Sequence, residues 1–258
     1  MKKAKKIKLL TVIAALLVMA MAIAGGSVAY FTDAKDITGV FVAGNVYIEL
    51  SEAAVKKDAT GNLVEDAESD RIVGGDIDGT DVIRDFGKVF PGQTIHKDPT
   101  IENTGDDSAW VAAKIILTDG AGDIHKLFGY EGYDDIDIES FLSGGLLGES
   151  VRVGEWNGIS DVCYNERYAM VQSASRERGV YEFYFFMLKS LESGESVEIF
   201  DTMTIDPFLD NSDMRELCEF QISVQAFAVQ EFGFSSCYDA MQGAFLEHFT
   251  SCVSLASQ

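Results

Sequence analysis

The sequence has few histidines and few basic residues, and each shortage argues against a class of function. Only three histidines occur in 258 residues, and none lies in an H-E-x-x-H motif, so a zinc hydrolase would have few ligands available. Lysine and arginine total 20 against 42 aspartates and glutamates, which gives a formal net charge of −22. A field of that sign repels phosphate backbones and anionic lipids, so nucleic acid is not an expected partner.

Cysteine is also scarce, with four residues in the chain: Cys163, Cys218, Cys237 and Cys252. In an oxidising exterior they could form two disulfides with three alternative connectivities, among which the sequence does not choose. Their spacing fits neither a zinc ribbon nor a redox motif. Cys237 and Cys252 flank a short helical stretch and form the first disulfide that we predict. Cys218 would pair with Cys163 only if their strands are neighbours.

A long apolar run occurs only near the N-terminus. Five lysines among the first eight residues precede the run from Ile7 to Ala24, and small residues including Ser27 and Ala29 follow it. This is the pattern of an export signal, with cleavage by a signal peptidase after Ala29 and a mature chain that begins at Tyr30. The alternative is a retained anchor, because about 18 apolar residues are borderline for spanning a membrane. Loss of the five lysines would bring the net charge to −27.

The mature chain has the patterns of an all-β protein. Its 229 residues suffice for one large domain that buries roughly 70 to 75% of its extended-chain surface without needing disulfides. Nine or ten expected strands, two short helices and only three prolines indicate an antiparallel two-sheet sandwich. The expected strands are 39–50, 82–90, 94–102, 109–118, 151–156, 162–171, 180–188, 196–205 and 218–225.

Turn signals and helical spacing complete this prediction. Pro91-Gly92 and Asn157-Gly158 are typical of tight turns between strands. Residues 51–81 are read as an extended loop or hairpin, and the strands at 180–188 and 196–205 are expected to form a hairpin. Residues 119–150 are predicted to be an insertion between strands, with a short helix at 135–142. Apolar residues at helical spacing predict a C-terminal helix over 236–248. Apolar and polar residues alternate in residues 218–225, so the side chains on one face should be buried in the core and those on the other face should be exposed to solvent.

Three segments resemble a known family. They are the junction from Gly25 to Asp33 with the following Val40 to Leu50, the turn and strand from Val89 to Asp98, and the segment Ile101 to Gly105 that ends in N-x-G. They are similar to the TasA/camelysin family, whose members are exported through the specialised SipW signal peptidase. Weaker echoes of the same family lie at Leu191–Ser196 and Ala228–Gln230, and together the resemblance covers about half of the chain. It implies a secreted jelly-roll subunit, here over residues 30–258, that polymerises with itself into biofilm matrix fibres by donor-strand exchange.

Under this reading the first residues of the mature chain are the donor arm. Such an arm lies in a groove between strands of the next subunit, where its main chain forms hydrogen bonds and its apolar side chains fill pockets. The alternative from the residues alone is an arm that packs on its own domain or is free. The predicted donor residues are Tyr30, Phe31, Thr32, Asp33, Ala34, Lys35, Asp36, Ile37 and Thr38.

Two other functions stay open. Because some camelysin-like relatives are described as metallopeptidases, a cell-surface metallopeptidase is one alternative; its best candidates are His96 beside Asp98 and His125 beside Asp123. We nevertheless expect no enzymatic activity and no obligatory cofactor, because no complete ligand set is visible. The other alternative is a calcium-dependent adhesion module, since three carboxylates surround a glycine in the loop that contains Asp76, Asp78 and Asp81.

The expected location is the extracellular matrix or the cell surface. The C-terminus carries no sortase-type or membrane-retention signal, so attachment to a cell would need an accessory anchoring or matrix protein. The other expected partners are further copies of the chain and, during export, the signal peptidase.

Overall fold

The structure is a computed structural model, and it describes residues 32–34, 46–74, 88–119, 142–148, 151–172, 180–216 and 220–249. The chain divides into two units, Met1–Tyr30 and Phe31–Gln258, and every described residue belongs to the second unit. The predicted export signal and its cleavage site at Ala29 and Tyr30 therefore lie outside the described residues. Within these ranges, the helices are too short or too polar to cross a membrane.

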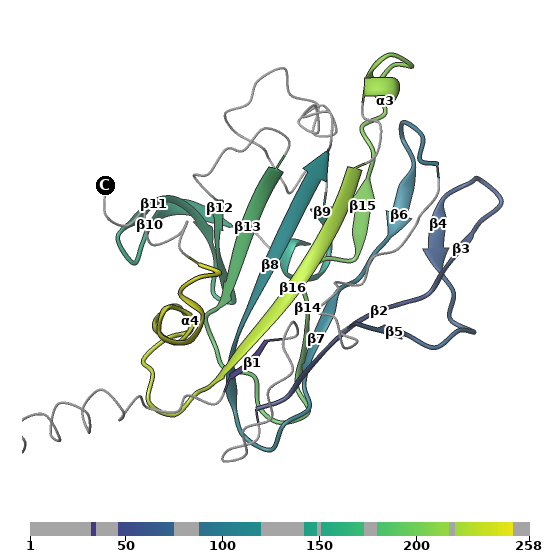
Figure 1. The fold of residues 1–258 in the computed structure, drawn as a ribbon. Coiled ribbons are helices and arrows are strands. Elements are labelled where there is room, and N and C mark those ends of the chain that lie inside the picture. The colour runs from purple at the N-terminus through teal and green to yellow at the C-terminus, as the bar shows by residue number, and fades with distance from the viewer. Residues whose placement is uncertain are drawn as a thin grey trace, which may run out of the picture. The chain divides into compact units, whose positions relative to one another are not determined.

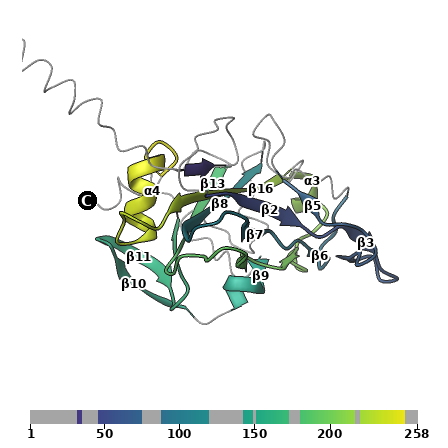
Figure 2. The same cartoon turned by 90° about the horizontal axis from the view of Figure 1, so that it is seen from below.

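The largest sheet has seven strands, in the order β1-β16-β8-β13-β12-β11-β10 (Figures 1 and 2). All neighbouring strands in it are antiparallel. β8 and β16 form its longest pair, in register from Ala109 opposite Gln230 to Asp119 opposite Phe220. The strands are β1 (Thr32–Ala34), β8 (Ala109–Asp119), β10 (Arg152–Trp156), β11 (Ile159–Tyr164), β12 (Tyr168–Gln172), β13 (Val180–Met187) and β16 (Phe220–Gln230).

Two smaller sheets contain the remaining strands. The four-stranded sheet has the order β14-β7-β2-β5, and the five-stranded sheet has the order β3-β4-β6-β15-β9. Among the strands of the described residues, only β4 and β6 pair in parallel. The strands are β2 (Ile48–Glu52), β3 (Val55–Lys57), β4 (Leu63–Glu65), β5 (Ile72–Val73), β6 (Thr94–His96), β7 (Thr100–Asn103), β9 (Leu142–Ser143), β14 (Ser196–Glu198) and β15 (Thr202–Thr204).

One antiparallel ribbon, residues 92–103 with 194–205, runs through both smaller sheets, and we call it the long ribbon. β7 pairs with β14 in the four-stranded sheet, and the same two segments pair again as β6 and β15 in the five-stranded sheet. Across the interruption, Ile199 N donates to Pro99 O at 3.0 Å and Lys97 N donates to Asp201 O at 2.9 Å. The two segments of the ribbon therefore remain hydrogen-bonded to each other where their regular strand geometry is interrupted.

Each end of the long ribbon is closed by backbone hydrogen bonds. Gly194 N donates to Asn103 O at 2.8 Å at one end, and Gly92 N donates to Ile205 O at 2.9 Å at the other. The predicted Pro91-Gly92 turn is confirmed: Gln93 N donates to Phe90 O at 3.0 Å, and Gly92 has a φ of 75° that glycine adopts readily.

Alternate side chains of the seven-stranded sheet enter two apolar cores. On β13, Phe183 and Phe185 belong to the main core, while Tyr184 and Phe186 belong to a second, C-terminal core. This is the period of two that a strand imposes. The main core joins the seven-stranded sheet to the two smaller sheets through residues such as Ile115, Ile95, Ile101 and Phe200, all of them fully buried. Burying each side chain of this size contributes roughly 1.5 to 3 kcal/mol.

The C-terminal core forms where helix α4 (Cys237–Phe245) covers the other face of the seven-stranded sheet (Figure 2). The helix begins at Ser236, whose hydroxyl accepts a hydrogen bond from Asp239 N at 3.2 Å. The predicted C-terminal helix is therefore confirmed. The described residues also contain the 3-10 helix η2 (Gly145–Gly148) and the short helix α3 (Asp213–Glu216).

The expected sandwich is confirmed as a mostly β fold, but one predicted strand pairing was wrong. The described residues form three sheets rather than two and no closed barrel, and the long ribbon is interrupted on both of its segments. Residues 180–188 and 196–205 do not form a hairpin: β13 pairs with β12 and β8, whereas β14 and β15 pair with β7 and β6.

The expected alternation in residues 218–225 is confirmed over its described part, because Ile222 and Val224 are buried whereas Gln221, Ser223 and Gln225 are exposed or half-buried. Beyond it, residues 226–229 are buried on both faces, with Ala226 and Ala228 in the main core and Phe227 and Val229 in the C-terminal core.

Two predicted strands are broken in the structure. Residues 94–102 form β6 and β7, separated at residues 97–99 beside Pro99, and residues 162–171 divide between β11 and β12. The Asn157-Gly158 hairpin between β10 and β11 is confirmed, with positive φ at both residues. Most of the predicted strands 39–50 and 82–90, and the helix at 135–142 in the 119–150 insertion, lie outside the described residues.

Candidate functional site

The predicted donor arm contributes one described strand, and that strand occupies an edge of the seven-stranded sheet. β1 pairs antiparallel with β16, with Thr32 opposite Val229, Asp33 opposite Ala228 and Ala34 opposite Phe227 (Figure 1). The other predicted donor residues, at 30–31 and 35–38, lie outside the described residues. The arm is therefore attached by main-chain pairing between segments almost 200 residues apart in the sequence.

The part of β16 that receives β1 is held firmly by its surroundings. Its other edge pairs with β8, where Phe227 lies opposite Ala112 and Val229 opposite Trp110. Ala228 packs in the main core, and Phe227 packs in the C-terminal core, 5.2 Å from Phe245 between ring centroids. A strand buried on both faces and paired along one edge presents its remaining edge in a fixed geometry, which suits the addition of a strand.

A second feature is an ionic cluster between β2 and the interruption of the long ribbon. The side chains of Glu52 and Lys97 are 2% and 1% exposed and form an ion pair. Glu52 continues the inward row of Ile48 and Leu50, so the strand period carries a carboxylate into the interior. A buried charge loses hydration that the protein interior does not replace. It is therefore tolerated only when an opposite charge lies next to it.

Asp98 and Arg71 extend the ionic cluster toward the surface. Asp98 Oδ1 accepts a hydrogen bond from Ala53 N at 2.7 Å, and Asp98 Oδ2 accepts one from Arg71 Nη1 at 2.5 Å. Arg71 also donates from Nη2 to Asp98 O and to Thr100 Oγ1, both at 3.0 Å, and from Nε to Ser51 Oγ at 3.1 Å. The cluster therefore connects β2, β7 and the residue that precedes β5.

One carboxyl close to this cluster is electrostatically perturbed. The pKa of Glu198, on β14, is raised above its ordinary value, first because partial burial disfavours the charged form and then because Asp201 and Asp98 repel it. His96 and Arg71 act in the opposite direction. The surroundings of Glu198 therefore favour its protonated form.

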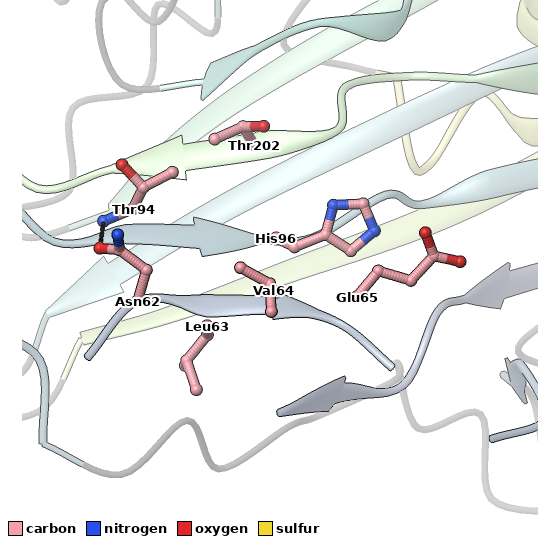
Figure 3. A pocket seen from close by; sticks show the side chains of 7 residues that line it. All are labelled: Asn62, Leu63, Val64, Glu65, Thr94, His96 and Thr202. Carbon is pink, nitrogen blue, oxygen red and sulfur yellow. Dashed lines mark hydrogen bonds between the residues drawn. The ribbon is translucent and has the colours of Figure 1, made fainter. Parts of the chain in front are cut away.

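A shallow groove of about 330 Å³ lies over β4, β6 and β15 (Figure 3). The side chain of Asn62 lies at one end, where its Oδ1 accepts a hydrogen bond from Thr94 N at 3.1 Å, and the imidazole of His96 and the carboxylate of Glu65 lie toward the other (Figure 3). The lining residues are Asn62, Leu63, Val64, Glu65, Thr94, His96 and Thr202.

The groove does not assemble the predicted peptidase residues into a catalytic arrangement. His96 Nε2 lies 3.7 Å from Asp98 Oδ1, and both oxygens of Asp98 are already engaged by Ala53 N and Arg71. Within the described ranges, no group of three or more histidine, cysteine, aspartate or glutamate residues could hold a metal. His125 and Asp123 lie outside these ranges, as do the candidate calcium residues Asp76, Asp78 and Asp81.

The predicted Cys237–Cys252 disulfide stays a prediction, because Cys252 lies outside the described residues. Cys237 carries a buried free thiol at the start of α4, and its Sγ donates to Val111 O at 3.1 Å. Burial raises the pKa of this thiol well above its usual range, so the group is inert as a nucleophile. Cys163 lies on β11 at intermediate burial, and Cys218 is outside the described residues.

Sequence reasoning missed the ionic cluster, although a signal was available. The row Ile48, Leu50 and Glu52 places a carboxylate where the alternation demands a core residue, and that pattern could have suggested a buried acid. No such pattern identifies Arg71 as a partner of Asp98, since 27 residues separate them.

No family model, no curated protein and no solved structure matches this chain.

Proposed function

We propose that the mature chain is a secreted structural protein of the TasA/camelysin family, which polymerises into extracellular biofilm matrix fibres by donor-strand exchange. Residues 30–38 are the donor arm, and the edge of β16 at Phe227–Val229 is the acceptor. The observation that carries this proposal is the pairing of β1 with β16 at the edge of the seven-stranded sheet.

The same proposal includes the finer architecture. The four-stranded and five-stranded sheets together act as one layer, joined by the long ribbon, and the seven-stranded sheet is the other layer of a jelly-roll sandwich. The main core contains residues of all three sheets, which supports this grouping.

The physical argument is that a short terminal strand is easily exchanged. Three residue pairs connect β1 to β16, whereas β8 and β16 share eleven. A terminal segment attached by so few pairs can be replaced by the same segment of another copy, because the hydrogen bonds gained equal those lost. Donation from each copy to the next is a heterologous contact that need not close, so a filament follows.

The test compares mature protein that starts at Tyr30 with a form that lacks residues 30–38, by negative-stain electron microscopy after concentration. Filaments are expected only from the form with the arm. A synthetic peptide of residues 30–38, added in excess, should raise the melting temperature of the shortened form and should cap growing filaments of the full mature form.

A pair of double variants tests the strand pairing itself. In Asp33→Pro with Ala34→Pro, one of the two adjacent residues must lose a backbone N–H that points toward β16, because successive N–H groups of a strand point to opposite sides. This variant should not form filaments. The matched variant Asp33→Asn with Ala34→Val keeps both donors and should assemble. If the proline variant assembles as well as its control, pairing by residues 32–34 is not the mechanism.

A further inference from the structure

The most deeply buried ion pair in the described residues brings together an amine and a carboxyl group, the two halves of an amide. The side chains of Glu52 and Lys97 are 2% and 1% exposed, and Lys97 Nζ is in direct contact with Glu52 Oε1. Glu52 follows Ile48 and Leu50 on the inward face of β2, and both of those residues belong to the main core. The two reactive groups are therefore held in contact away from bulk water.

Two other lysine–carboxylate pairs in the described residues provide a comparison. Lys56 Nζ lies 2.8 Å from Asp66 Oδ1, and Lys114 Nζ lies 2.7 Å from Glu182 Oε1. Both of these pairs are more exposed, and in each the second carboxylate oxygen accepts a hydrogen bond from a hydroxyl group. Glu52 Oε2, by contrast, is buried and has no hydrogen-bond partner. The charge of Glu52 is therefore stabilised at one oxygen only.

The backbone on both sides of the pair is fixed. On one side, β2 is paired with β7. On the other side, Ala53 N donates to Asp98 Oδ1 at 2.7 Å. These two residues directly follow Glu52 and Lys97, so their hydrogen bond holds the two reacting segments together. Reacting groups that are held in a productive geometry have effective concentrations of about 10⁵ to 10⁸ M, so the fold supplies the proximity that a condensation requires.

We propose that Glu52 and Lys97 condense after folding to form an intramolecular amide cross-link between β2 and the interruption of the long ribbon. The product replaces two buried charges with one neutral amide. Because the interior restores little of the hydration that the charges lose, the same burial that penalises the ion pair favours this neutral product. The cross-link lies within one copy of the chain and does not depend on the proposed polymerisation.

The condensation balances in atoms and charge. The Lys97 ammonium transfers a proton to Glu52 Oε1 across their contact, which gives a neutral amine and a carboxylic acid, and burial lowers the cost of this neutral pair relative to the ionic one. The Nζ lone pair then attacks Cδ and forms the C–N bond, since a desolvated lysine amine is a nucleophile. The C–O bond to the protonated oxygen breaks, and the hydroxyl leaves as water with a second proton from Nζ. The reaction needs no oxidant, reductant or other co-reactant.

The cross-link changes how force passes through the chain. Glu52 and Lys97 lie 45 positions apart, and strands β3, β4, β5 and β6 all lie between them. Tension applied at the N-terminus of the mature chain reaches Glu52 and passes through the amide to Lys97, so the intervening segment does not extend. At 3.3 to 3.6 Å per residue, the cross-link withholds roughly 150 Å of extension. The bond therefore protects these four strands from being pulled out of the fold.

The first measurement is the intact mass of the mature chain, residues 30–258, in denaturant and reductant. The wild type should be lighter than its sequence by one water molecule, and a protease digest should contain a branched peptide that joins the segments of Glu52 and Lys97. Lys56 and Lys114 are the internal controls, and the peptides that contain them should not be branched at these lysines. A mass equal to that of the sequence, with Glu52 and Lys97 in separate peptides, overturns the inference.

A matched variant and a time course assign the lost water to this pair. Lys97→Arg keeps a cation beside Glu52, but its guanidinium stays protonated and does not attack the carboxyl group, so this variant should have the mass of its sequence. Wild-type chain that is purified from insoluble material in urea, without previous folding, should also have the full mass and should lose water only after refolding. This time course needs no variant that folds. Loss of the same water by Lys97→Arg, or by the chain that has never folded, overturns the inference.

Single-molecule extension between residues 30 and 258 measures the mechanical effect. Linked wild-type chain should extend by roughly 150 Å less than chain that is newly refolded and still unlinked, and equal extensions contradict the cross-link. Filament formation is scored separately. Linked chain that forms no filaments supports the cross-link and refutes the proposed polymerisation. Filaments formed by chain that keeps its full mass overturn the cross-link and leave the polymerisation standing.

Discussion

The seven-stranded sheet and the long ribbon are both antiparallel, but different forces stabilise their centres. The seven-stranded sheet has apolar side chains on both faces, with Phe183 and Phe185 in one core and Tyr184 and Phe186 in the other. The long ribbon is interrupted, and a buried ion pair between Glu52 and Lys97 lies beside the interruption. Apolar burial is non-directional and tolerates small shifts, whereas a buried charge requires its partner in place.

This difference has a consequence for assembly. The acceptor edge of β16 belongs to the apolar region, where the edge is supported on both faces. The ribbon, by contrast, has the buried ion pair of Glu52 and Lys97 beside its interruption. Changes in pH should therefore affect the ribbon more than the acceptor edge, whereas salt screens a buried pair little, and four predictions test that comparison in order of decreasing effect.

Truncation of a ring in the C-terminal core should have the largest effect. The ring centroid of Phe186 lies 5.2 Å from that of Trp156, 5.5 Å from Tyr238 and 5.4 Å from Phe249. Phe186→Ala removes these contacts and leaves a cavity, so the free energy of unfolding in urea should fall by about 4 kcal/mol. The loss should be independent of salt. Phe186→Leu retains most of the volume and should lose much less; equal losses would contradict tight packing at this site.

Removal of the buried cation in the ribbon should have the next largest effect. Lys97→Met leaves the carboxylate of Glu52 uncompensated, and the free energy of unfolding should fall by about 3 kcal/mol relative to the unlinked wild-type chain. The double variant Glu52→Leu with Lys97→Met removes both charges and should recover most of that loss. A double variant as unstable as the single one would show that packing, not charge, determines the cost.

Loss of the N-cap of α4 should have a smaller effect. Ser236→Ala removes the acceptor of the Asp239 N–H, so the free energy of unfolding should fall by about 1 kcal/mol. Ser236→Thr keeps a hydroxyl at that position and should behave like the wild type. If Ser236→Thr is as unstable as Ser236→Ala, loss of this hydrogen bond does not explain the lower free energy of unfolding.

The smallest expected effect is a pH dependence in the ribbon. Because the pKa of Glu198 is raised on folding, the folded state binds the proton more tightly, and the charged carboxylate opposes folding at neutral pH. Glu198→Gln should therefore increase the free energy of unfolding at pH 7. The gain should decrease as the pH falls through the raised pKa of the folded state and should be absent below the ordinary value of 4.5. Glu155→Gln, at an exposed position of β10, is the control, and the same profile in both variants would contradict the assignment.

Much of the seven-stranded sheet could be predicted from the sequence. The apolar runs of β8 and β13 and the alternation in β16 identify strands, Asn157-Gly158 identifies a hairpin, and Ser236 begins a helix. These signals act over a few residues, so the local chain contains the information. The hairpin expected between 180–188 and 196–205 failed because proximity in sequence was taken for pairing in space. The partners of β14 and β15 in the long ribbon, β7 and β6, lie about 100 residues earlier in the chain.

The candidate site divides in the same way. The sequence alone indicated that residues 30–38 could act as an extended arm, and it marked His96 and Asp98 as neighbours. Only the tertiary structure showed that Arg71 and Ala53 occupy the Asp98 carboxylate, that β1 pairs with β16, and that Glu52 and Lys97 are buried in contact with each other.

The sequence by itself determined the β class, the acidic surface and the main turns, because propensity, charge and turn geometry depend on neighbouring residues. The tertiary structure decided which strands share a sheet, which charges are buried together and which edge receives the arm. Those outcomes depend on contacts between residues far apart in the chain, and their free energies exist only when the whole chain is folded.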